Sequence, residues 1–163
     1  MKKWLLNLYA KLRAKLNPVK LEKDNPEWDK YMSLSISEFS SKINKFPYKS
    51  DKLGGLIDRT ESFSHFIDPD VKSDRDCDDF ARMWTMWGIC NDYRATEVIV
   101  TSKKHFFKDS HVVTVLYKNG KHILCNYKVY ASKNSLEEAL DYLKSWGTSY
   151  VDGYIYAISI IEN

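Results

Sequence analysis

The segment His111–Tyr127 reads HVVTVLYKNGKHILCNY and fixes the arrangement of the sheet that we expect. Its centre, Asn119-Gly120, is typical of a two-residue type I′ turn, because both residues of such a turn need positive φ angles. This turn pairs Lys118 with Lys121 and so sets which residues face each other along the hairpin. We therefore predict two antiparallel strands in a single register.

The register of this hairpin brings a histidine and an asparagine together. Val113 is expected to face Asn126, and His111 to face Lys128. Since side chains alternate across a strand, these four lie on one face of the sheet. His111 and Asn126 are then diagonal neighbours, with Cβ atoms roughly 7 Å apart. Cys125 points to the opposite face, where we expect it to pack in the core.

The rest of the chain indicates an α+β fold, with helices first and a mostly antiparallel sheet after them. Segments rich in Val, Ile and Tyr are expected to form strands, and they are residues 95–101, 110–117, 121–130 and 154–161. A helix is expected over residues 134–147, with Asn134 or Ser135 as its N-cap and Gly147 at its end.

The N-terminal part combines helices with long irregular segments. Residues 1–18 are predicted to form an amphipathic basic helix, and residues 19–163 a single domain. Within that domain, residues 19–30 read as a polar linker and residues 48–76 mostly as loop. Ser35 and Glu38 fit a capping box for a helix to about residue 46. We expect the N-terminal helix to pack on its own domain, with docking to a partner or a membrane surface as the alternative.

Composition narrows the class of protein. The 163 residues are 44% hydrophobic and carry a net charge of +3, which suits one globular domain and indicates neither a nucleic-acid footprint nor a site for acidic substrates. Three cysteines without a Cys/His cluster indicate free thiols in a reducing compartment. With no convincing secretion signal and no apolar run long enough to span a membrane, we expect a cytoplasmic or virion-associated protein that uses no cofactor and no metal.

Cys77 lies at the start of a predicted helix that runs to about Gly88. Asp76 and the acids that follow it suit the first turn, because carboxylates complement the exposed N–H groups there. The residues of one apolar stripe, which should face the core, are Cys77, Phe80, Ala81, Trp84 and Trp87. We therefore expect the thiol at the end of a buried helix, pointing inward.

Nucleophilic catalysis by cysteine needs a thiolate, a histidine that takes the thiol proton and a third group that orients the imidazole. Cys77, His111 and Asn126 supply one candidate for each role. A helix N-terminus and a nearby imidazolium favour the thiolate, whereas carboxylates that face the sulfur oppose it. The helix dipole contributes only about 0.3–1 kcal/mol, so we expect an ion pair with the histidine to supply most of the activation.

Three segments resemble the transglutaminase-like branch of the papain-fold cysteine enzymes, which includes the bacterial transglutaminase-like cysteine peptidases: DCDDFARMWTMWGI (76–89), ATEVIV (95–100) and HVVTVLYKNGKHILCNY (111–127). The resemblance implies a papain-like fold in which Cys77 is the nucleophile, His111 the general base and acid, and Asn126 the orienting group. The family usually has Gly where this chain has Arg75, and more often Asp than Asn at the third position.

These features predict thiol-dependent acyl transfer on an amide or isopeptide bond, as in a cysteine peptidase or amidase. The expected partner is a protein or peptide substrate, for which a peptidoglycan peptide is one candidate. Water as acceptor gives hydrolysis, and an amine gives transamidation. The alternative from another class is a catalytically inactive transglutaminase-like structural or adaptor protein, for example a phage component. Arg75 departs from the pattern of the resembled family, and the chain has no Gln to serve as the side-chain oxyanion donor that papain-type enzymes use.

Three other patterns have simpler explanations. The acids between Asp68 and Asp79 fit a calcium loop poorly, and we interpret them as loop and capping residues. The Trp and Tyr side chains fall at core periodicity, which favours a core over a nucleic-acid-binding surface. His65, His105 and His122 are expected at the surface or in loops, with His122 as the rival candidate for the base.

Overall fold

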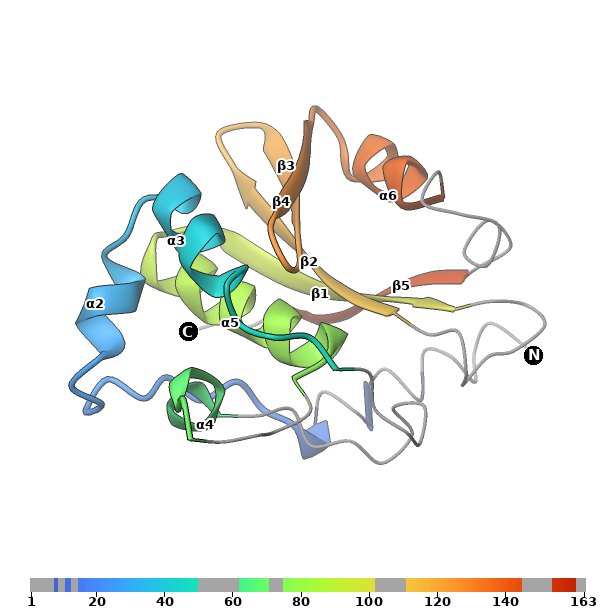
Figure 1. Cartoon of the computed structure of the whole chain (residues 1–163). Coiled ribbons are helices and arrows are strands. Elements are labelled where there is room, and N and C mark those ends of the chain that lie inside the picture. The colour runs from blue at the N-terminus through green and yellow to red at the C-terminus, as the bar shows by residue number, and fades with distance from the viewer. Residues whose placement is uncertain are drawn as a thin grey trace.

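The computed structural model describes residues 8, 11–12, 15–49, 62–70, 75–101, 111–144 and 154–160. Its helices are α2 (Trp28–Met32), α3 (Ile36–Ile43), α4 (Phe63–Ile67), α5 (Cys77–Cys90) and α6 (Leu136–Lys144). Its strands are β1 (Arg94–Thr101), β2 (His111–Lys118), β3 (Lys121–Cys125), β4 (Val129–Lys133) and β5 (Tyr154–Ile160). Helices come first and an antiparallel sheet follows, so the α+β class is confirmed (Figure 1).

The strands form one sheet in the order β4-β3-β2-β1-β5, and every neighbouring pair is antiparallel. The predicted hairpin turn is confirmed, because Asn119 and Gly120 have φ angles of 52° and 75°. Lys118 pairs with Lys121, which confirms the predicted register of β2 on β3. In this strand order β2 is the middle strand of the sheet, and His111 is its first residue.

The single strand predicted for residues 121–130 is wrong, because the structure divides it into β3 and β4. The ladder with β2 ends at Cys125, and a tight turn that begins at Asn126 follows. Asn126 therefore lies beyond the ladder and does not pair with Val113. The predicted pairing of His111 with Lys128 is absent as well. This break turns the Asn126 side chain away from the position that simple strand alternation predicts.

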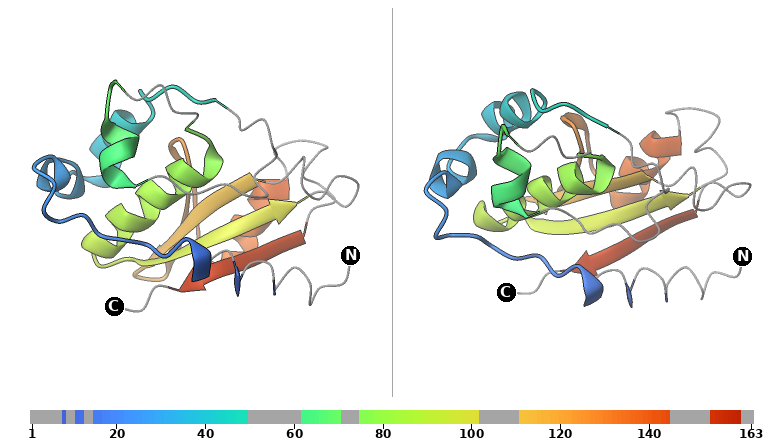
Figure 2. Two further views of the ribbon diagram at one scale, coloured as in Figure 1. Left: turned by 90° about the horizontal axis from the view of Figure 1, so that it is seen from below. Right: turned by 60° about the horizontal axis from the view of Figure 1, so that its bottom comes forward.

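Helix α5 lies against one face of the sheet and α6 against the other (Figure 1). On the α6 side, Leu143 packs with apolar residues of three strands, namely Val98, Val113, Val115 and Leu124. On the α5 side, the N-terminal helices cover the surface of α5 that faces away from the sheet (Figure 2). As a result Asp78–Gly88 are all buried, whereas the sequence predicts burial of one stripe only.

At its C-terminal end α5 approaches β2 very closely. A Cβ atom at Gly88 would collide with the side chain of Leu116 and touch Ala95 at 3.4 Å. Leu116 is fully buried there. The absence of a side chain at Gly88 therefore lets the helix and the strand pack directly against each other.

The segment predicted as a linker takes part in the fold. Glu22 accepts hydrogen bonds from the backbone N–H groups of Phe63 and Ser64, at 2.8 and 3.2 Å, and so caps α4. Trp28, in the same segment, is buried in the main core cluster. Helix α4 itself is missing from the sequence prediction, which assigned its residues to a loop. It has only five residues, and its N-cap is Ser62, whose side chain accepts the His65 N–H at 3.2 Å.

Two predicted caps are present. Ser35 and Glu38 form the predicted capping box at the start of α3, although the helix ends at Ile43. At α6 the Ser135 side chain accepts the Glu138 N–H at 3.1 Å. The predicted end of this helix, Gly147, lies outside the described residues.

The N-terminal helix is described at residues 8, 11–12 and 15–16, which are all helical, and its predicted beginning lies outside the described residues. The chain is then held by Arg82 of α5, which donates to the Asn17 carbonyl at 2.9 Å and pairs with Glu97 of β1 at 2.7 Å. In the described part of the chain, the structure contains no helix with the length and apolar character needed to cross a bilayer.

Candidate active site

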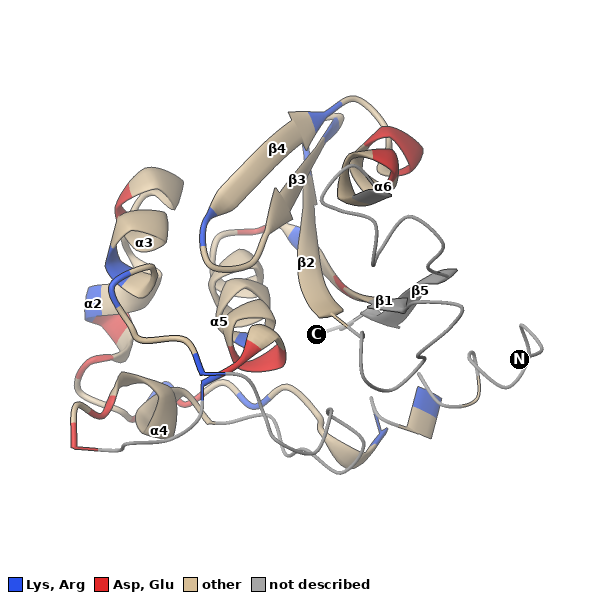
Figure 3. Ribbon diagram, turned by 45° about the vertical axis from the view of Figure 1, so that its right-hand side comes forward, with Lys and Arg blue, Asp and Glu red and all other residues tan. Residues whose placement is uncertain are grey.

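Cys77 is the first residue of α5, as the sequence predicts, and its side chain is half-buried. Asp76 is the N-cap: its side chain accepts the Asp78 N–H at 3.2 Å, and its own N–H donates to the Asp79 carboxylate at 3.1 Å. Figure 3 shows the resulting acidic first turn of α5 beside the start of β2. The cap fixes the direction in which α5 begins, and with it the position of Cys77.

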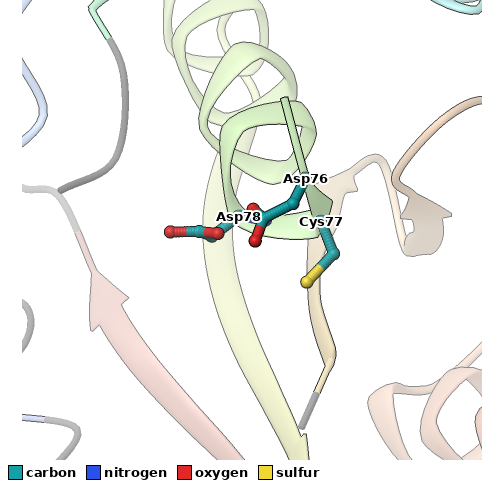
Figure 4. Close-up of side chains that lie close together, drawn as sticks. All are labelled: Asp76, Cys77 and Asp78. Carbon is teal, nitrogen blue, oxygen red and sulfur yellow. The ribbon is translucent and has the colours of Figure 1, made fainter. Parts of the chain in front are cut away.

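The Cys77 sulfur points toward the beginning of β2 (Figure 4). The backbone N–H of Val112 donates to Sγ at 3.4 Å. Val112 directly follows His111, so the thiol lies at the end of β2 that carries the predicted base, although neighbouring residues of a strand point to opposite faces of the sheet. A backbone donor aimed at sulfur stabilises negative charge there.

Hydrogen bonds inside the core set the register of α5 on β2. The Thr114 hydroxyl donates to the Ala81 carbonyl at 2.6 Å and lies 3.1 Å from the Thr85 hydroxyl, which also contacts the Ala81 carbonyl at 3.0 Å. Both threonines are fully buried. Because such bonds are directional, they fix how far the helix can slide along the strand and so fix where Cys77 meets Val112.

Two carboxylates lie near the thiol. One oxygen of Asp76, one oxygen of Asp78 and the Cys77 Sγ are all within 4.8 Å of one another. Figure 4 shows the Asp78 carboxylate pointing to the opposite side from the sulfur. The Asp76 carboxylate accepts a cap N–H, which supports the prediction that these acids cap the helix. Their negative charge opposes the thiolate, whereas the helix N-terminus and the Val112 N–H favour it.

His111 is half-buried at the start of β2, with its ring 6.3 Å from that of Tyr127. Burial lowers the pKa of His111 to about 4, and the nearby Asp78 charge only partly opposes this. The imidazole is therefore neutral at pH 7. A neutral imidazole can take the thiol proton as a base, and activation of the thiol by an ion pair with His111 stays a prediction.

Asn126 is fully buried, and its contacts differ from those predicted. Its Nδ2 donates to the Cys77 carbonyl at 2.8 Å and to the Val112 carbonyl at 2.5 Å. Its Oδ1 is buried without a hydrogen-bond partner. The side chain thus ties the first residue of α5 to the second residue of β2, while the backbone carbonyl of Asn126 accepts from the Trp84 indole.

A cleft of about 710 Å³ opens beside His111. Its lining consists of Tyr48, His111, Tyr127, Lys128, Val129, Tyr130 and Tyr142. Burial raises the pKa of Tyr48, Tyr127 and Tyr130, the last to about 12, and the charge of Cys77 contributes to the first two. The cleft therefore presents protonated phenols beside His111, and Cys77 is not among its lining residues. Sequence reasoning missed the tyrosines, because their spacing does not show which of them meet.

Arg75, which stands where the resembled family has Gly, has a structural role. It is 3% exposed and donates to the carbonyls of Phe66 and Asp68 at 2.7 and 2.8 Å. Its own carbonyl accepts the Lys49 N–H at 3.0 Å. Arg75 thus holds the end of α4 against the segment that leads into Cys77.

The other candidate thiols and bases lie elsewhere. His122 packs against Tyr117 at the turn end of the hairpin, about 17 Å along the strand from Val112, so the rival base is not near the thiol. Cys125 is fully buried, as predicted, and Cys90 is exposed at the far end of α5. His105 lies outside the described residues, as does the middle of the acidic segment between Asp68 and Asp79.

Comparison of the chain with protein-family models, with curated proteins and with solved structures finds no match. The site must therefore be interpreted from its own geometry.

Proposed function

We propose that the protein is a thiol-dependent acyl-transfer enzyme with a papain-like, transglutaminase-like arrangement, which acts on an amide or isopeptide bond of a protein or peptide. The observation that carries this proposal is the hydrogen bond from the Val112 N–H to Cys77 Sγ, because it joins the helix-start thiol to the strand that carries His111. His111 also lines the adjacent cleft, which offers room for a substrate next to the base.

In the proposed reaction the proton moves during attack. Neutral His111 takes the Cys77 proton as sulfur bonds to the substrate carbonyl carbon, and the carbonyl oxygen becomes an oxyanion. The imidazolium then protonates the leaving amine, the C–N bond breaks and a thioester remains. Water, deprotonated by His111, attacks the thioester, and the departing sulfur regains its proton. Hydrolysis is the proposed outcome, and an amine in place of water would give transamidation.

Asn126 acts in this proposal as a positioning residue. Its amide N–H₂ group holds the backbone of Cys77 and Val112 in place. Its unpaired Oδ1 is the atom left to orient an imidazole N–H, which is the role that the family resemblance assigns. A neutral amide stabilises the imidazolium less than a carboxylate would, so the proposal predicts a slow enzyme.

Cysteine labelling tests the proposal without a known substrate. Iodoacetamide would be added to the native protein and the modification of each thiol followed by mass spectrometry. We expect Cys77 to react faster than Cys90, which is exposed but whose pKa is raised by partial desolvation. The buried Cys125 should remain unmodified. His111→Ala should slow Cys77 at least about tenfold, whereas His122→Ala, the matched control, should leave it unchanged. Equal rates at Cys77 in all three proteins would contradict the proposal.

A catalytically inactive adaptor is the second candidate, and the Asp76 and Asp78 carboxylates beside the thiol favour it. In that case the hydrogen bonds of Asn126 serve stability alone. Cys77 would then react no faster than Cys90, and peptide substrates would show no turnover.

A further inference from the structure

The N-terminal helix carries a row of exposed leucines. Leu8, Leu12 and Leu16 are spaced four residues apart, which places them on one side of a helix. Their exposed fractions are 47%, 49% and 76%. Apolar side chains gathered on a surface in this way mark a contact surface, and among the described residues the two main core clusters do not include these three.

The same segment is strongly basic. Six of the 25 Lys and Arg residues of the chain fall within residues 1–21, and none of its 22 Asp and Glu residues does. The segment therefore carries +6 and residues 22–163 carry −3, which together give the net charge of +3. Lys11 and Lys15, which alternate with the leucines, are both exposed. This charge favours an anionic partner.

The end of the helix is fixed to the body of the protein. Arg82 donates to the Asn17 carbonyl and is itself held by the buried ion pair with Glu97. Pro18 follows at once and cannot continue the helix. Whatever binds the helix would therefore be connected to α5, the helix that carries Cys77.

We propose that this helix binds the surface of an anionic lipid bilayer and lies parallel to it. The leucines enter the boundary between head groups and acyl chains, while Lys11 and Lys15 contact the lipid phosphates and carboxylates. A lipid surface fits better than a protein groove, because exposed leucines bordered by lysines match both the apolar and the anionic layers of such a membrane. Trp4 and Tyr9, in the same segment, are residue types enriched at membrane interfaces.

Vesicle co-sedimentation of the whole chain tests this proposal. Phosphatidylcholine vesicles with and without phosphatidylserine would be compared at low and at physiological salt. We expect binding to the vesicles that contain phosphatidylserine and a decrease with salt. Lys11→Ala/Lys15→Ala should weaken binding roughly 30-fold, since each lysine contributes about 1 kcal/mol near an anionic surface. Leu12→Ser/Leu16→Ser should weaken it about tenfold or more.

The control removes two exposed lysines elsewhere, in Lys23→Ala/Lys45→Ala, and should bind as the unchanged protein does. Thermal unfolding of each variant shows whether it is folded. Absence of binding to phosphatidylserine vesicles, or equal binding to both kinds of vesicle, would overturn the proposal. The proposal would also be overturned if the protein self-associated without lipid and Leu12→Ser/Leu16→Ser abolished this association. The leucines would then contact a second copy of the chain.

Discussion

The two ends of the contact between α5 and β2 are held together by different forces. At the Cys77 end the contact depends on hydrogen bonds, from Asn126 to two backbone carbonyls and from the Val112 N–H to sulfur. At the Gly88 end it depends on close van der Waals packing against Leu116. Directional bonds fix polar groups in a defined geometry, whereas close packing gives rigidity without placing any reactive group. The chemistry is therefore expected at the hydrogen-bonded end.

The largest expected effect comes from Asn126→Asp, the residue that the resembled family more often has. A carboxylate at this buried position would face the carbonyl oxygens of Cys77 and Val112 with no proton to donate. We expect the free energy of unfolding at pH 7 to fall by about 3–5 kcal/mol, as for other uncompensated buried charges. Urea denaturation measures this loss.

Asn126→Ala is the matched comparison, because it removes the donor without adding a charge and should cost about 2 kcal/mol. Asn126→Asp could instead be as stable as the unchanged protein and label faster at Cys77. The main role of Asn126 would then be to orient the imidazole, and our view that it mainly holds the backbone of Cys77 and Val112 would be wrong.

The second prediction concerns pH at the same end. The pKa of His111 is lowered to about 4 by burial, against about 6.5 in an unfolded chain, so the unfolded state binds more protons between these values. The contribution of His111 to the free energy of unfolding should therefore be complete above pH 6.5. It should decrease as the pH falls toward 4, by up to about 3 kcal/mol. His111→Gln should show a flatter dependence in urea denaturation over the same range. Parallel curves for the two proteins would be inconsistent with a neutral, buried His111.

The third prediction tests the packed end. Gly88→Ala introduces a methyl group against Leu116, and overpacking should cost about 2 kcal/mol. If α5 is rigid, the Cys77 labelling rate should remain the same while the protein is folded. A change in that rate without loss of stability would show that the two ends are coupled through the helix.

The smallest effect is expected between the two ends, where Thr85 and Thr114 meet. Thr114→Val removes the bond to the Ala81 carbonyl and should cost about 1 kcal/mol in urea denaturation. Thr85→Val/Thr114→Val should cost less than the sum of the single changes, because it removes both hydroxyls of the pair together. Additive costs would mean that the two hydroxyls do not interact.

The features that the sequence predicts correctly depend on local chemistry. The Asn119-Gly120 turn, the Ser35 capping box and the Asp76 cap each involve residues within a few positions of one another, so short motifs identify them. The placement of Cys77 at the start of a buried helix follows from the same kind of pattern. Local signals thus define most of the elements near the candidate site.

The features that the sequence does not predict depend on distant partners. Asn126 interrupts the expected strand, and its buried side chain bonds to Cys77, far away in the chain. Glu22 accepts the first N–H groups of α4 in addition to its local cap, Ser62, and Arg75 donates to carbonyls at the end of α4. Periodicity carries no information about such pairings. The same reason hides the tyrosines that line the cleft beside His111.

The position of β5 has a consequence for how the protein is made. It is the last described strand in the chain, yet it pairs with β1 on the side away from β2. While the ribosome is still synthesising the C-terminal part, β1 has an open edge that other nascent chains can join. Synthesis of β5 is then the step that protects this edge of the sheet, and a chain cut before Tyr154 should need chaperones to stay unaggregated.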